Sequence, residues 1–221
     1  MKIKNIIFDF DGVLCESVDI KTEAFYEMYL SYGDDIASKV RLHHLQNGGM
    51  SRFDKFNFYE QELLKKEITQ SKIDKLSEVF SNLVLTKVIE APLVEGVNNF
   101  LKSYAENYNC FIVSATPMEE MKKICKEKSI DSYFNAIFGS PKSKIDWVKE
   151  ILLTNKLNKS ETLFIGDAMS DYTAAKENNI HFLLRRTQNN KNIFTDKNML
   201  SINDFVNLER YLKRLSDESR I

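Results

Sequence analysis

Short apolar segments alternate with helical segments along most of this 221-residue chain. The apolar runs are rich in Ile, Val and Phe, as buried strands are, and cover residues 3–10, 110–114, 136–138, 162–165 and 181–184. Helical patterns at residues 118–128, 145–154 and 171–178 separate the last four runs. This order predicts right-handed strand–helix–strand crossovers, and therefore an α/β fold built on a doubly wound parallel sheet of about five strands.

One long segment interrupts this alternation. Residues 17–89 have helical periodicity but no convincing strand, and Gly48-Gly49 divides them. Pro92 and Gly96 mark the return to the sheet. We therefore expect a core domain formed by residues 1–16 and 90–221, with an inserted helical cap domain at residues 17–89. A last amphipathic helix is expected at residues 201–215.

Charge and cysteine content narrow the class of protein. The 31 Lys and Arg residues nearly balance the 32 Asp and Glu residues, and no basic block could bind a run of phosphates, so nucleic acid is not an expected partner. The three cysteines lack metal-ligand spacing, which indicates free thiols in a reducing compartment. No stretch approaches the roughly 18 apolar residues of a membrane span. We expect a cytoplasmic protein without membrane contacts, either a monomer or a homodimer.

Two acids lie at the end of the first predicted strand. Asp9 and Asp11 stand two residues apart in the segment Asp-Phe-Asp-Gly-Val. Ligands of open α/β sheets gather at the carboxyl ends of the strands, so both acids are expected at a crevice rather than in the core. Paired carboxylates repel each other unless a cation is present. The pair therefore indicates a cation site, although an Asp-Gly turn at a polar strand end is the simpler alternative.

A polar segment also follows the second strand. Thr116 is expected to cap the next helix together with Glu119, in the pattern of a capping box. Ser114 has no such structural role, and it lies near the backbone amides of a helix N-terminus, which can bind a phosphate oxygen. Ser114 is therefore a candidate phosphate ligand.

A lysine follows the third predicted strand, and a pair of acids follows the fourth. Lys144 is expected in the first turn of a helix, where the helix dipole disfavours a cation unless an anion lies nearby. Lys142 is the competing candidate for the same role. Asp167 and Asp171 flank a tight turn into the next helix, and their carboxylates could complete the oxygen ligands of a hard cation such as Mg²⁺.

In this order, the four motifs resemble those of the haloacid dehalogenase (HAD) superfamily, in the phosphoglycolate phosphatase and β-phosphoglucomutase-like branch with a helical cap. The motifs are DFDGV (9–13), SAT (114–116), the lysine of PKSK (141–144) and GDAMSD (166–171). The resemblance covers essentially the whole chain and implies a Rossmann-like core. It also implies that Asp9 is the nucleophile and Asp11 the general acid and base.

The same resemblance implies how the remaining motif residues act. Ser114, Ala115 and Lys144 would bind the phosphate. Asp9, Asp11 and Asp167 would hold a Mg²⁺ ion, and Asp171 would support the metal site.

Asp11 also distinguishes among reactions. Dehalogenases of this fold lack an acid two positions after the nucleophile, because no alkoxide leaving group has to be protonated, so Asp11 favours phosphoryl transfer. The resemblance thus implies a Mg²⁺-dependent phosphatase that hydrolyses a small phosphorylated metabolite, such as a sugar phosphate or a phosphoglycolate-like acid, through an aspartyl-phosphate.

Two other functions stay open. Residues 48–53 resemble the Gly-x-x-Ser-Arg substrate loop of β-phosphoglucomutase-like proteins, and Arg52 could bind a substrate carboxylate or second phosphate through its planar guanidinium. The same residue could equally well begin a helix that Ser51 caps. A sugar phosphomutase is one alternative, although the pattern of Asp167 and Asp171 is more typical of phosphatases. A non-catalytic protein that only binds a phosphorylated ligand is the other.

Overall fold

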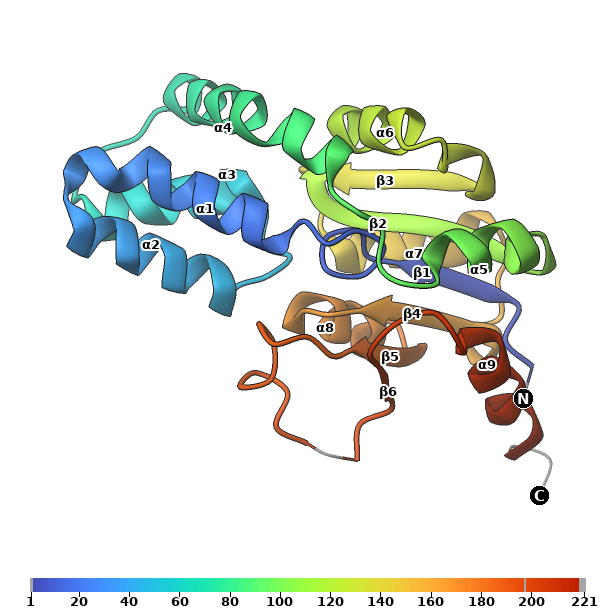
Figure 1. Cartoon of the computed structure of the whole chain (residues 1–221). Coiled ribbons are helices and arrows are strands. Elements are labelled where there is room, and N and C mark those ends of the chain that lie inside the picture. The colour runs from blue at the N-terminus through green and yellow to red at the C-terminus, as the bar shows by residue number, and fades with distance from the viewer. Residues whose placement is uncertain (1, 197, 219–221) are drawn as a thin grey trace.

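A six-stranded parallel sheet forms the centre of the molecule within residues 2–196 and 198–218, which the computed structural model describes (Figure 1). The strands are β1 (Asn5–Phe8), β2 (Asn109–Pro117), β3 (Ala136–Ser140), β4 (Thr162–Gly166), β5 (His181–Arg185) and β6 (Ser201–Ile202). Their order across the sheet is β3-β2-β1-β4-β5-β6. The expected doubly wound α/β architecture is confirmed, and β1 lies where the strand order reverses direction.

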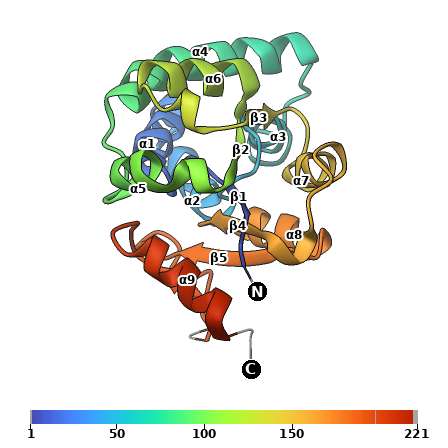
Figure 2. The ribbon, with the colours of Figure 1, turned by 90° about the vertical axis from the view of Figure 1, so that its right-hand side faces the viewer.

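Helices cover both faces of this sheet (Figure 2). Ile6 and Phe8 of β1 pack in one cluster with α5 (Val97–Tyr104), α6 (Met118–Glu127) and α9 (Leu208–Glu218). Ile7 points to the opposite face and packs with α7 (Lys144–Thr154) and α8 (Met169–Glu177). Because β1 is buried on both faces, its last three residues are all apolar instead of alternating with polar residues.

The helical insertion between β1 and β2 is also confirmed. It contains α1 (Val18–Tyr29), α2 (Asp34–Gln46), α3 (Arg52–Phe58), a π-helical turn η2 (Tyr59–Leu63) and α4 (Gln70–Glu90). Short 3₁₀ turns occur at η1 (Leu30–Tyr32), η3 (Ala105–Asn107), η4 (Asp131–Tyr133) and η5 (Lys159–Glu161). The interior of this cap contains packed aromatic rings, with Phe25 against Phe56, Tyr59 and Phe80. The cap thus has an apolar centre of its own.

Two connecting segments join the cap to the core, and they run side by side. The backbone N–H of Glu16 donates to the carbonyl of Pro92 at 3.0 Å, and that of Val94 donates to the carbonyl of Leu14 at 3.0 Å. The loop after β1 that contains Asp9 and Asp11, here called the acidic loop, is therefore followed directly by a segment that is hydrogen-bonded to the chain leaving the cap. None of the described helices combines the length and the apolar character that a membrane crossing requires.

The C-terminal region differs from expectation in one element. Residues 201–215 were expected to form one helix, but Ser201 and Ile202 pair with β5 as a sixth strand, and α9 begins only at Leu208. The backbone N–H of Arg186 donates to the carbonyl of Ile202 at 2.8 Å. Pairing with the open edge of β5 decides the conformation of these residues, because local periodicity does not register long-range hydrogen bonds.

Candidate active site

The acidic loop begins directly at the carboxyl end of β1. The backbone N–H of Asp9 continues the sheet by donating to the carbonyl of Ile165 at 3.0 Å, and the Asp9 carboxylate accepts the N–H of Phe10 at 2.7 Å. Gly12 has a positive φ of 75°, and a Cβ atom there would lie 2.2 Å from an Asp167 carboxylate oxygen. Glycine at this position therefore lets the loop after β1 approach the loop after β4.

Three carboxylates meet at this point. Asp9, Asp167 and Asp171 each offer an oxygen, and these oxygens lie within 4.8 Å of one another. Burial, and then repulsion from Asp171, raise the pKa of Asp9 to about 7, despite the opposing effect of Lys144. Burial and the charge of Asp9 also raise the pKa of Asp167 well above its usual value. Such a cluster fits a hard divalent cation, which would favour the ionised carboxylates.

Lys144 lies inside this cluster. Its Nζ is 2.8 Å from Asp9 and 2.6 Å from Asp171, and the side chain is buried. Burial alone would lower the pKa of Lys144, but Asp171 and Asp9 raise it above its usual value. Lys142 instead pairs with Glu150 and lies over the ring of Trp147. The geometry therefore favours Lys144 over Lys142 as the lysine of the site.

Asp171 orients the loop that carries Asp167. Its carboxylate accepts the backbone N–H of Asp167 at 3.2 Å and that of Ala168 at 3.0 Å, in addition to Lys144. From the other side, the amide of Asn190 donates to the Asp167 carbonyl at 2.9 Å. These contacts hold the loop around Asp167, while the function of Asp171 in supporting a metal site stays a prediction.

Asp11 turns away from the carboxylate cluster and towards the cap. Its carboxylate accepts hydrogen bonds from Ser17 at 2.6 Å, from Lys21 at 2.5 Å and from Thr116 at 3.2 Å. Burial favours the neutral acid, but Lys21 and these hydrogen bonds hold the pKa of Asp11 below its usual value. Asp11 is therefore ionised in this conformation.

Thr116 was expected to cap α6, but it does not. β2 continues to Pro117, α6 begins at Met118, and Pro117 is the N-cap without a side-chain hydrogen bond. The Thr116 hydroxyl instead accepts from Lys21 at 2.7 Å and donates to Asp11. The expected capping box was wrong because the hydroxyl finds charged partners from the cap and from the loop after β1. By contrast, Ser143 caps α7 and accepts the N–H of Asp146 at 3.1 Å.

Ser114 and Ala115 lie at the same end of β2. The Ser114 hydroxyl is buried and accepts the N–H of Thr116 at 3.1 Å. Ala115 and Thr116 line the pocket that contains Asp9, Asp11 and Asp167. Of the residues named as phosphate ligands, Ala115 thus lines the pocket and Lys144 contacts Asp9, while the function of Ser114, Ala115 and Lys144 as ligands stays a prediction.

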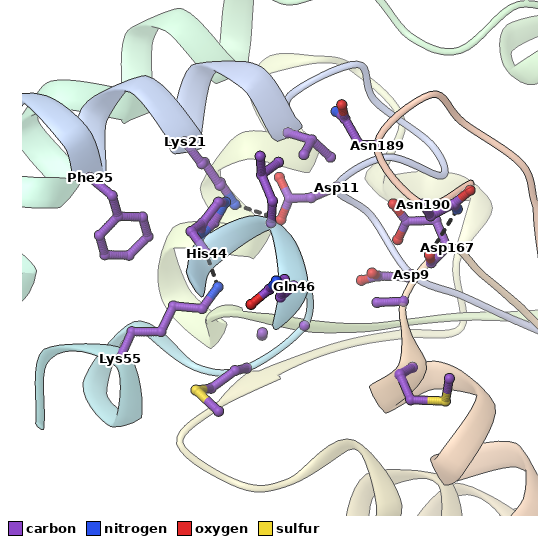
Figure 3. A pocket seen from close by; sticks show the side chains of 18 of the residues that line it. Asp9, Asp11, Lys21, Phe25, His44, Gln46, Lys55, Asp167, Asn189 and Asn190 are labelled. Atoms are coloured by element: carbon purple, nitrogen blue, oxygen red, sulfur yellow. Dashed lines mark hydrogen bonds and ion pairs between the residues drawn. The ribbon is translucent and has the colours of Figure 1, made fainter. Parts of the chain in front are cut away.

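The pocket lies between the core and the cap (Figure 3). Its core side carries the acidic residues, and its cap side carries Lys21, Phe25, His44 and Lys55. The cap loop at Gly48 and Gly49 contacts the start of α8, where the hydroxyl of Ser170 donates to the Gly48 carbonyl at 3.2 Å. A substrate bound over Asp9 would therefore contact side chains from both parts of the chain.

Arg52 lines this pocket but is already paired. Its guanidinium forms a bidentate ion pair with Glu120 of α6, at 2.6 and 2.9 Å, and donates to Ser81 of α4 at 2.5 Å. Burial would raise the pKa of Glu120, but Arg52 and Ser81 hold it below its usual value. The expected contact between Arg52 and a substrate anion stays a prediction, because in this structure the partner is Glu120. The pair joins the cap to the core.

Two buried lysines of the pocket were not identified from the sequence. Lys21 and Lys55 are only 7% and 2% exposed. Each occupies the apolar face of its helix, Lys21 beside Ala24 and Phe25, and Lys55 beside Phe56 and Tyr59. A lysine at a position where the helical period requires an apolar residue is the signal that could have revealed them.

The raised pKa of Asp9 leads to a pH-dependent effect of Mg²⁺. Without metal, Asp9 keeps its proton in the folded protein up to about pH 7, whereas its ordinary pKa is 3.8. The stability from this bound proton is complete below about pH 4 and is lost as the pH rises towards 7. Mg²⁺ must displace the same proton. We therefore expect MgCl₂ to raise the melting temperature clearly at pH 7.5 and much less at pH 5, measured by thermal unfolding.

A matched variant checks the origin of this effect. Asp167→Asn should reduce the Mg²⁺-dependent shift at both pH values, because it removes one carboxylate of the cluster that could hold the cation. Equal shifts of the wild-type protein at pH 5 and pH 7.5 would show that protonation of Asp9 does not compete with the metal.

Comparisons with known proteins are consistent with this geometry. Residues 6–184 match the family model described as haloacid dehalogenase-like hydrolase. A comparison with curated protein sequences finds no significant match.

Solved structures with the same fold cover nearly the whole chain. A β-phosphoglucomutase from Clostridium difficile is 18% identical and superimposes with a TM-score of 0.78, over 98% of each chain. A haloacid dehalogenase-like family hydrolase from Streptococcus pneumoniae is 20% identical, with a TM-score of 0.69 over 95% of this chain and 98% of the other. A predicted phosphoglycolate phosphatase from Haemophilus somnus is 16% identical, with a TM-score of 0.69 over 96% and 98%. At these identities the similarity concerns the fold.

Proposed function

We propose that this chain, which belongs to the haloacid dehalogenase-like hydrolase family, is a Mg²⁺-dependent phosphatase that hydrolyses a small phosphorylated metabolite. The observation that carries the proposal is the position of Asp9, whose carboxylate lies within 4.8 Å of Asp167 and 2.8 Å from Lys144. Under this proposal Asp9 is the nucleophile, Asp9 and Asp167 hold the cation, and Lys144, which contacts Asp9, binds the phosphate.

The donor set fits Mg²⁺. Asp9 and Asp167, together with the main-chain carbonyl of Asp11, would hold the ion, since Mg²⁺ prefers oxygen ligands. Within the described residues, Asp9, Asp11, Asp167 and Asp171 pair only with the cations Lys21 and Lys144, which leaves an excess of negative charge. When bound, Mg²⁺ would offset this charge and that of the phosphoryl group, so that a carboxylate can approach phosphorus.

The side chains of the pocket supply the remaining chemistry. A carboxylate oxygen of Asp9 attacks phosphorus, the ester P–O bond breaks, and Asp11 donates a proton to the departing alkoxide. Water then attacks the aspartyl-phosphate, and Asp11 accepts a proton from it, which regenerates Asp9 and releases phosphate. Lys144, Ser114 and the backbone of Ala115 bind the phosphoryl oxygens. Lys144 also favours the ionised form of Asp9, which is the nucleophilic form.

Asp11 must change its protonation state during this cycle. In the present conformation Lys21, Ser17 and Thr116 favour its ionised form, which is the form that accepts a proton from water. Burial alone favours the neutral acid, so loss of the contact with Lys21 would raise the pKa of Asp11 and let it carry the proton for the leaving group. The contact between α1 and the acidic loop thus connects cap position to the acid–base state of Asp11.

We also propose that residues 17–89 act as a cap domain that excludes water during phosphoryl transfer. The contacts between Arg52 and Glu120, and between Ser170 and Gly48, support this role because each of them joins the cap to the core. Direct binding of a substrate anion by Arg52 would require the guanidinium to exchange Glu120 for the substrate.

Phosphate release tests the proposal. The protein is incubated with Mg²⁺ and a panel of sugar phosphates, phosphoglycolate and p-nitrophenyl phosphate, and both inorganic phosphate and phosphorylated isomers are measured. We expect phosphate to accumulate, to cease on addition of EDTA and to resume with excess Mg²⁺. An isomer formed without phosphate would establish a phosphomutase instead. Ligand binding without any product would support a non-catalytic protein.

A further inference from the structure

Lys55 is a buried cation on the cap side of the pocket. It lies on α3, is 2% exposed and lines the same pocket as Asp9. Its Nζ is 2.9 Å from Nδ1 of His44 and 5.6 Å from the centre of the Phe25 ring (Figure 3). The ammonium group is therefore surrounded by an imidazole and an aromatic face.

The other cations around this pocket have acidic partners. Lys21 pairs with Asp11 at 2.5 Å, Arg52 pairs with Glu120 at 2.6 Å, and Lys144 pairs with Asp9 at 2.8 Å. Lys55 differs from them, because no carboxylate in the described part of the chain forms an ion pair with it. Among these cations, it is the one whose charge is left for a ligand to balance.

His44 gives Lys55 a hydrogen bond but no negative charge. Burial, and then the charges of Lys55 and Lys21, hold the pKa of His44 well below its usual value, so the imidazole is neutral. Burial and the charge of Lys21 lower the pKa of Lys55 itself to about 7. A buried ammonium without a counter-charge is costly, and an anion placed beside it would gain both Coulomb energy and hydrogen bonds.

We propose that Lys55, supported by His44, binds a second anionic group of the substrate, so that the enzyme prefers phosphomonoesters that carry a carboxylate or another phosphate. This inference rests on the proposed function, since it assumes that the ester phosphate lies at Asp9. The sequence motif suggested that Arg52 binds such a second anionic group, but the Arg52 guanidinium is already bound to Glu120. We assign this contact to Lys55 instead.

Matched pairs of esters test this preference. 2-Phosphoglycolate is compared with ethyl phosphate, 3-phosphoglycerate with glycerol 3-phosphate, and fructose 1,6-bisphosphate with fructose 6-phosphate. In each pair the first compound adds one anionic group, a carboxylate in two pairs and a phosphate in the third. We expect the wild-type protein to show a higher kcat/KM for the first compound of at least one pair, and the pair that responds identifies the anion.

The variant Lys55→Met removes the charge and keeps the side-chain length. We expect it to reduce the preference within the responding pair by roughly 30-fold, mainly through KM, as for loss of one partner of a buried charged contact. Lys142→Met is the control, because Lys142 pairs with Glu150 outside the pocket, and its preference should equal that of the wild type. Thermal unfolding of both variants confirms that they are folded.

Binding measured without turnover separates this inference from the proposed function. Titration calorimetry in the presence of Mg²⁺ compares the affinities of phosphonoacetate and ethylphosphonate, which differ only in the carboxylate. A bisphosphonate tests whether a second phosphate-like group is bound in the same way. Tighter binding of a doubly anionic ligand that is lost in Lys55→Met supports the inference even if no ester is hydrolysed. Ester hydrolysis with equal affinity within every pair, or a preference that Lys55→Met leaves intact, would overturn the inference and leave the phosphatase function standing.

Discussion

Asp9→Asn is expected to abolish phosphate release and, at the same time, to stabilise the metal-free protein. Asparagine has no anionic oxygen to form an aspartyl-phosphate, so kcat should fall by roughly 10⁴-fold or more. In the wild-type protein the Asp9 carboxylate is buried beside Asp167 and Asp171, with a pKa raised to about 7. Removing one charge from this cluster at pH 7.5 should raise the free energy of unfolding by about 1–2 kcal/mol in EDTA.

The two measurements are phosphate release with Mg²⁺ and thermal unfolding in EDTA. Asp74→Asn is the control, because Asp74 is an exposed residue of α4 and its replacement should change neither quantity appreciably. Substantial activity of Asp9→Asn would exclude Asp9 as the nucleophile. An inactive variant that is less stable than the wild type in EDTA would show that repulsion among these carboxylates does not destabilise the metal-free fold.

The core part of the site could be predicted because it depends on the direction of the strands. Asp9, Ser114, Lys144 and Asp167 each lie at or after the carboxyl end of a predicted strand, and parallel strands bring their carboxyl ends to one edge of the sheet. The order of apolar runs was therefore sufficient to predict that residues far apart in sequence converge. The boundary between cap and core, expected at residues 16–17 and 89–90, stays a prediction, although α1 begins at Val18 and α4 ends at Glu90.

The cap part of the site could not be predicted in the same way. Which face of a cap helix meets the core depends on helix packing. Lys21 is buried where α1 meets Asp11 and Thr116, and Lys55 is buried beside His44 and Phe25 of neighbouring cap helices. Glu16 is similar, since its role becomes clear only from its pair with Arg185, which also donates to the carbonyl of Gly12 at 2.9 Å. These contacts join segments that lie far apart in the sequence, and no local sequence pattern indicates them.

Lys144→Met is expected to have the opposite effect on stability from Asp9→Asn. Lys144 lies 2.8 Å from Asp9 and 2.6 Å from Asp171, so its loss leaves these buried carboxylates without their shared cation. Removing one partner of a buried ion pair typically costs about 3–5 kcal/mol. We expect Lys144→Met to lose this order of stability at pH 7.5 in EDTA, measured by urea unfolding, and to lose phosphate release as well.

The pH dependence of this variant identifies the cause. Without Lys144 the Asp9 pKa should rise further, because that lysine is the group that lowers it. The folded variant then keeps a proton above about pH 7 that the folded wild-type protein has lost, so the deficit in stability should shrink as the pH falls from about 9 to about 7 and change little below that. Mg²⁺ at pH 7.5 should also restore part of this stability, because the cation balances the same carboxylates.

Lys142→Met should show none of these effects, since Lys142 pairs with Glu150 away from the cluster. A deficit that is independent of both pH and Mg²⁺ would instead assign the loss to packing around α7.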